Sequence, residues 1–101
     1  MKVVMMCMMK VLPGEMAEYM ELEREMFALS ERLGMPPWRR LMELSGGGDI
    51  QHSSLYEMEF ANFAALDDFY KMGENPEMAA FMPRFDPVVE SHEHDIYVTM
   101  S

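Results

Sequence analysis

The sequence predicts one α+β domain, in which a four-stranded antiparallel sheet carries two helices on one of its faces. Three observations lead to this fold class. Residues 2–11 form an apolar run, residues 15–33 have the spacing of an amphipathic helix, and residues 46–49 are a glycine-rich turn between two strand-like stretches. With 101 residues, the chain has room for a single hydrophobic core.

Residues 2–11 (KVVMMCMMKV) are predicted to be a strand buried on both faces. Apolar side chains follow one another without a break from Val3 to Met9, whereas a half-exposed strand would alternate apolar and polar residues. The turn at residues 12–14 ends the run too early for a long helix. Because the helices of the chain can cover one face of the sheet, the other face requires a partner subunit.

Residues 15–33 are predicted to form an amphipathic helix that ends at Gly34. Its inward face is expected to carry Met16, Tyr19, Met20, Met26, Phe27 and Leu33, with Leu22 and Leu29 at the margin. Its outward face is acidic, with Glu15, Glu18, Glu21, Glu25 and Glu31, and Glu23 nearby.

Residues 38–45 and 50–60 are predicted to be two strands of a hairpin. In the second of them, alternation places Ser54, Tyr56, Met58 and Phe60 on one face and Leu55, Glu57 and Glu59 on the other. Asn62 is expected to cap a helix over residues 63–72 that Gly73 ends, and Asn75 with Pro76 to open a short helix over 77–82. Residues 95–100 are predicted to be the last strand.

This order of elements is the ferredoxin-like split βαβ arrangement, with both helices on one face of the sheet. The apolar residues of the other face would be covered by a second copy, and a symmetric dimer is the commonest way to do so.

The chain resembles the dimeric α/β-barrel superfamily, and NIPSNAP-like domains in particular. The resemblance rests on the turn Leu12–Pro13–Gly14, the helix start GEMAEYMELE, Trp38, the segment FANFAALDDFY, and Asn75–Pro76–Glu77. It implies a homodimer joined through the sheet face. It also implies a cofactor-independent enzyme, of monooxygenase, cyclase or isomerase type, acting on an aromatic or polyketide-like molecule in an apolar cavity. The alternative is a non-catalytic module for small-ligand binding or assembly.

Composition excludes several function classes. The net charge of −10 leaves no basic face for nucleic acid and opposes docking to anionic membranes. No stretch has the length of a membrane span, and a signal peptide is not expected. A single cysteine allows no internal disulfide and fits the cytoplasm. The fifteen methionines either line a pliable apolar pocket or replace Leu and Ile in an ordinary core.

The candidate catalytic residues are His52, Glu57 and Arg40. His52 or a glutamate would act as a general base, and Arg40 would steady developing negative charge. The alternatives are an exposed histidine at the hairpin, a solvated carboxylate, and arginines that pair with glutamates such as Glu57, Glu59 or Glu43.

The candidate substrate-binding residues are apolar or aromatic: Trp38, Tyr56, Met58, Met5 and Met9. His92 and His94 could supply two ligands for zinc or non-haem iron, with a third from Glu90, Asp95 or His52, but a solvated loop ahead of the last strand is the favoured interpretation. Likewise, Met5, Cys7 and Met9 are interpreted as packed core rather than as a copper site. No metal and no cofactor are expected.

Overall fold

The computed structural model describes residues 1–41 and 54–100, and its elements follow the ferredoxin-like order. The strands are β1 (Val3–Val11), β2 (Arg39–Leu41), β3 (Ser54–Phe60) and β4 (Val89–Val98). The helices are α1 (Met16–Arg32), α2 (Phe63–Gly73), α3 (Pro76–Phe81) and the 3-10 turn η1 (Met82–Phe85). All pairings are antiparallel and the sheet order is β2-β3-β1-β4, which confirms the predicted fold class.

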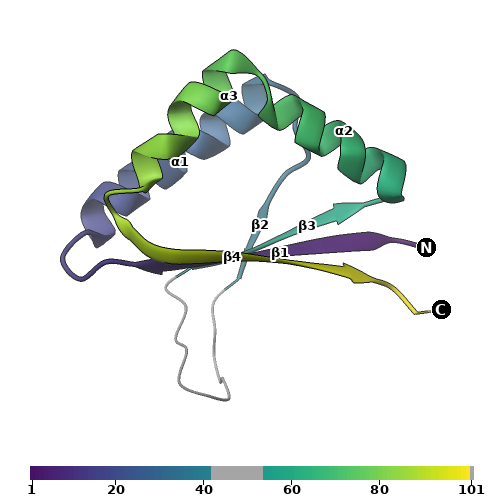
Figure 1. Ribbon diagram of the computed structural model, residues 1–101, viewed down its shortest axis with the longest axis horizontal. Coiled ribbons are helices and arrows are strands. Elements are labelled where there is room, and N and C mark those ends of the chain that lie inside the picture. The colour runs from purple at the N-terminus through teal and green to yellow at the C-terminus, as the bar shows by residue number, and fades with distance from the viewer. Residues whose placement is uncertain (42–53, 101) are drawn as a thin grey trace.

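The three α-helices all lie on one side of the sheet (Figure 1). We call this side the helix face and the opposite side the open face. The two chain ends lie close together, because β1 and β4 are neighbours and the Thr99 N–H donates to the Lys2 carbonyl at 3.0 Å.

The central strand β1 is buried on its helix face and half-buried on its open face. Val3, Met5, Cys7, Met9 and Val11 are at most 8% exposed, while the residues between them are partly exposed. The single chain therefore buries β1 fully on the helix face and only in part on the open face, whereas the sequence predicts burial on both faces. The half-buried row Val4, Met6 and Met8 on the open face is the part that a partner would cover.

The inward stripe of α1 is shifted from the predicted one. Leu22 and Leu29 lie in the core at 2% and 7% exposure, whereas Met16 and Met20 are 43% and 41% exposed. Glu23, predicted among the acidic outward residues, is buried at 4% exposure. The stripe thus runs through residues 19, 22, 23, 26, 29 and 30, which is the regular helical spacing measured from Tyr19.

The predicted caps of the later helices are confirmed. The Asn62 side chain accepts a hydrogen bond from the Ala65 N–H at 2.9 Å at the start of α2. Asn75 accepts from the Glu77 N–H at 2.9 Å at the start of α3, with Pro76 in the first turn. The helix α2 includes Gly73 and ends one residue later than predicted.

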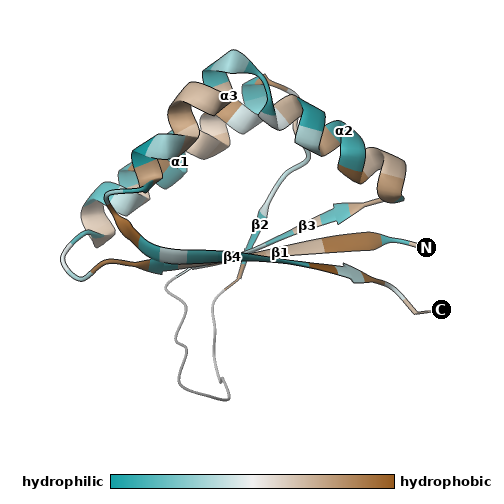
Figure 2. Cartoon of the chain, viewed as in Figure 1, coloured by the Kyte–Doolittle hydropathy of each residue, from teal (hydrophilic) through white to brown (hydrophobic). Residues whose placement is uncertain are grey.

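The last strand is longer than predicted. β4 begins at Val89 and pairs with β1 up to Val98, so His92 and His94 lie within the strand and not in a loop ahead of it. The first part of this strand is hard to predict from composition, because the middle of β4 is hydrophilic, whereas the adjoining β1 is hydrophobic (Figure 2). Polar residues on an edge strand discourage unwanted pairing with other chains.

The predicted strands 38–45 and 50–60 are described only in part, as β2 and β3. The turn at 46–49 and His52 lie outside the described residues.

Candidate functional site

A cleft of about 540 Å³ lies between the edge strand β4 and the α3–η1 segment. It is bounded on the sheet side by Met9 of β1 and by the first residues of β4. Its lining is apolar on one part and polar on another: Met9, Ala79, Met82, Pro83, Phe85 and Val89, then Asp86, Glu90, Ser91, His92 and His94. A mixed wall of this kind can hold an apolar molecule and present a few polar groups to it.

The strand register places both imidazoles on the helix face. His92 is opposite Met9 and His94 is opposite Cys7, and residues directly opposite in an antiparallel pair share a face. The two imidazole ring centroids are 5.0 Å apart. Both side chains are solvent-exposed and both line the cleft, so a ligand there could contact either ring.

The His94 imidazole is biased toward its neutral form. Partial burial of the ring lowers its pKa from the ordinary value of 6.5, and the neighbouring His92 lowers it further, while Asp95 acts in the opposite direction. At neutral pH a ring nitrogen of His94 is therefore available to accept a proton.

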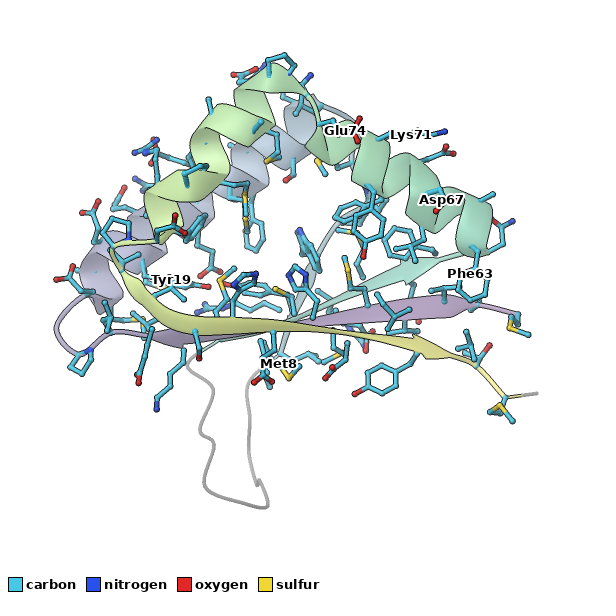
Figure 3. The ribbon with its side chains drawn as sticks, viewed as in Figure 1. Met8, Tyr19, Phe63, Asp67, Lys71 and Glu74 are labelled. Carbon is cyan, nitrogen blue, oxygen red and sulfur yellow. The ribbon has the colours of Figure 1, made fainter. Side chains whose placement is uncertain are left out.

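Two buried tyrosines stand behind the cleft wall. The hydroxyl groups of Tyr19 and Tyr56 share a hydrogen bond, and the Tyr19 hydroxyl also lies 3.3 Å from the Met9 sulfur. The Tyr19 ring packs edge-on against Phe85, with centroids 5.7 Å apart. Figure 3 shows Tyr19 between α1 and the sheet, whereas Met8 projects from the open face.

Burial raises the pKa of both phenols, so both keep their protons at neutral pH. For Tyr56, the hydrogen bond with Tyr19 adds to this effect. The pair thus supports Met9 and Phe85 from behind as a neutral, hydrogen-bonded unit.

An ion pair with a buried carboxylate and a partly exposed arginine acts on the tyrosines. Arg40 Nε lies 3.2 Å from Oε1 of Glu23, and the Glu23 side chain is only 6% exposed. The other carboxylate oxygen of Glu23 has no hydrogen-bond partner among residues 1–41 and 54–100. The sequence analysis missed Glu23 as a site residue, although its spacing of four from Tyr19 places both on one helix face.

Two of the predicted catalytic residues, Arg40 and Glu57, lie on opposite faces of the sheet. Arg40 faces the helices and binds Glu23, whereas Glu57 lies on the open face and pairs with Arg39. Each arginine pairs with a glutamate, as the alternative interpretation predicts. Arg40 does so on the helix face and Arg39 on the open face. His52 is outside the described residues.

The predicted substrate-binding residues separate into three groups. Met5, Tyr56 and Met58 are each 1% exposed and belong to the core. Trp38 is half-buried, contacts the rings of Tyr56 and Phe69, and lines a separate groove beside α1. Of the five, Met9 lines the cleft at β4.

No three His, Cys, Asp or Glu side chains within the described part of the chain are arranged to hold a metal ion. His92 and His94 are adjacent, yet neither Glu90 nor Asp95 completes a set with them. Met5, Cys7 and Met9 are packed in the core, as interpreted from the sequence. Burial raises the pKa of the Cys7 thiol to about 12, so it remains protonated.

Comparison with solved structures identifies the fold. A NIPSNAP domain protein from Burkholderia xenovorans aligns over 100% of this chain and 96% of its own, with 18% identity and a TM-score of 0.73. A DABB family protein with a ferredoxin-like fold from Mesorhizobium loti aligns over 99% and 98%, with 20% identity and a TM-score of 0.64. The chain has the fold of the NIPSNAP and DABB proteins. The resemblance inferred from the sequence is confirmed at this level.

Two further solved structures share this fold. A protein described as an antibiotic biosynthesis monooxygenase covers 100% of both chains at 14% identity and a TM-score of 0.70. A dimeric protein of unknown function from Bacteroides fragilis aligns over 95% of this chain and 94% of its own, at 17% identity and a TM-score of 0.65. At these identities the likeness establishes the fold and not the activity.

No family model and no curated protein matches the sequence. None of the described helices is long and apolar enough to cross a membrane.

Proposed function

We propose that this chain is a homodimeric, cofactor-independent enzyme that removes an acidic proton from an aromatic or polyketide-like molecule in the cleft at β4. One observation carries the proposal: a cleft with a partly apolar wall holds two adjacent imidazoles, one of which is biased toward its neutral form. The antibiotic biosynthesis monooxygenase of the same fold supports this reaction class.

The reaction follows from the placement of the two histidines. His94 would accept the proton from an acidic C–H or O–H bond, and the bonding electron pair would remain on the substrate as an enolate or phenolate. His92, 5.0 Å away between ring centroids, could donate an N–H to the oxygen that gains the charge. Monooxygenase, cyclase and isomerase chemistry can each start from this anion.

The test is deuterium uptake by benzoylacetone, a 1,3-diketone with an aromatic ring, followed by NMR in deuterated buffer. General-base catalysis contributes roughly a hundredfold or more, so His94→Ala should lower the protein-dependent rate by that order. Asp67→Asn, a substitution on the outward side of α2 (Figure 3), is the matched control and should retain the rate. Equal rates for wild type and His94→Ala would remove His94 as the base.

The homodimer is proposed to form through the open face. Val4, Met6 and Met8 of β1, with Leu41 and Leu55 beside them, make a half-buried apolar centre. Charged residues border this row directly: Glu57 and Glu59 of β3, paired with Arg39 and Lys2, lie on one side, and Glu93 and Asp95 of β4 lie on the other. An apolar row bordered by charged residues suits an interface, and the dimeric Bacteroides fragilis protein supports this assembly.

Sedimentation velocity tests the dimer. Met6→Glu should yield a monomer, because a symmetric interface would bring two added carboxylates into the apolar centre. Ala64→Glu adds the same charge to the exposed surface of α2 and should leave the dimer intact. A wild-type monomer with a folded core would contradict this assembly.

A non-catalytic ligand-binding module is the second candidate, and one observation favours it. No lysine or arginine lines the cleft at β4, so an anion formed there would have no cationic partner. Benzoylacetone binding without deuterium uptake above the buffer rate would select this candidate.

A further inference from the structure

We infer that the cleft at β4 selects its ligand by charge: it accepts uncharged or amine-bearing aromatic compounds, with Asp86 as the partner of the amine, and rejects carboxylates. The inference rests on the proposed ligand site and adds the class of ligand that this site takes. It follows from where the chain places its few cations and from one unpaired carboxylate.

The cations of the chain are almost all paired. The sequence has eight lysines and arginines, and seven of them form ion pairs with glutamates. The pairs are Lys2–Glu59, Lys10–Glu90, Arg24–Glu21, Arg32–Glu77, Arg39–Glu57, Arg40–Glu23 and Arg84–Glu25. A carboxylate ligand would therefore have to compete with a glutamate of the protein for any of these groups.

The eighth cation is Lys71, which lies on the outward side of α2, away from the cleft at β4 (Figure 3). Residues 42–53 and 101, which the structure does not describe, contain no lysine or arginine, so they cannot supply a cation of this kind to the cleft. The cleft thus has no lysine or arginine of this chain with which to neutralise an anion.

The carboxylates of the cleft are differently placed. Glu90 is partly neutralised, because its Oε2 lies 3.5 Å from the Lys10 ammonium group. Asp86 follows η1 directly, lines the cleft, and forms no ion pair among the described residues. Its charge adds to the field of a protein with net charge −10.

The His94 imidazole does not reverse this balance at neutral pH. Partial burial and the neighbouring His92 lower its pKa and hold it toward its neutral form, so it offers no positive charge to a carboxylate. A bound amine, in contrast, could approach Asp86 while its aromatic body packs on Phe85 and Met9. The cleft therefore presents apolar surface together with a single unpaired negative charge.

The experiment measures binding of three matched probes to the purified protein at neutral pH and low salt: naphthol, naphthoate and naphthylmethylamine. We expect naphthylmethylamine to bind about fivefold more tightly than naphthol, which is the size of one partly exposed ion pair. Naphthoate should bind at least fivefold more weakly than naphthol.

Variants assign the effect to Asp86. Asp86→Asn should abolish the preference for the amine over naphthol, while Asp86→Lys should favour naphthoate. Asp67→Asn on α2 is the control of equal charge change and should behave as wild type.

The outcomes separate this inference from the proposed function. Naphthoate binding as tightly as naphthol, or an amine preference that survives Asp86→Asn, would overturn the charge selection and leave the ligand site standing. If none of the three probes binds, the ligand site itself fails and the selection fails with it.

Discussion

Replacement of Arg40 tests whether this residue stabilises the fold or acts on a substrate. Arg40→Ala would leave the Glu23 carboxylate, 6% exposed, without its cation, and one of its oxygens already lacks a partner among the described residues. Breaking a fully buried pair costs about 3–5 kcal/mol. The Arg40 side chain is 43% exposed, so water can replace part of the loss, and we expect about 2 kcal/mol. For a domain of this size, the midpoint of thermal unfolding would fall by about 10 °C.

Urea unfolding at a fixed protein concentration provides the measurement, because dimerisation would otherwise shift the apparent stability. The double variant Glu23→Leu/Arg40→Met should recover most of the loss, since it removes both charges and keeps apolar volume in the core. Arg24→Ala breaks the exposed pair with Glu21 and should cost less than about 0.5 kcal/mol. A change below about 0.5 kcal/mol for Arg40→Ala, with a large loss of deuterium uptake, would refute this reasoning and return Arg40 to a catalytic role.

Three further predictions concern single side chains. Asn62→Ala should lower the free energy of unfolding by about 1 kcal/mol in the same urea experiment, because the cap of α2 is lost; no change would mean that the cap is replaced by water. Since the folded pKa of His94 is below 6.5, stability should be constant above this pH and fall as the pH drops through 6.5 to the lower folded value. His94→Gln should flatten this part of the profile, and an unchanged profile would contradict the lowered pKa. The Cys7 thiol, 4% exposed and with a pKa of about 12, should react with a thiol reagent at neutral pH only on unfolding, and rapid labelling of the native protein would contradict its burial.

The fold could be predicted from the sequence because its signals are local. The uninterrupted apolar run of β1, the caps at Asn62 and Asn75, and the helical spacing of α1 each depend on neighbouring residues. The start of β4 could not be predicted in this way. Residues 90–94 are polar, and they form a strand because β1 offers nine residues of backbone to pair with, a contact distant in sequence.

The site was predicted less well, for the same reason. The sequence indicated alternation on β3, so Glu57 was correctly assigned to the face opposite Tyr56, but no local pattern shows which face meets the helices. The charge of Glu23 predicts exposure to solvent, although its helical position favours burial. Its partner Arg40 lies on strand β2, and a partner of this kind cannot be identified from the spacing of either residue.

The cleft lies at β4 because the helix layer does not extend as far as this edge of the sheet. The residues of β1 and β3 that face the helices are buried, whereas the residues of β4 from Glu90 to Val98 are exposed, so the helix layer ends before the edge strand. An uncovered apolar row there would attract other chains, and histidines at positions 92 and 94 avoid this while keeping ring surface toward Met9 and Cys7. Because these two positions hold imidazoles instead of aliphatic side chains, they also provide the only titratable nitrogen atoms on this part of the helix face among the described residues. Protection of the sheet edge and the capacity to accept a proton therefore come from the same two residues, and a variant such as His94→Leu should lose proton transfer while gaining a tendency to associate through β4.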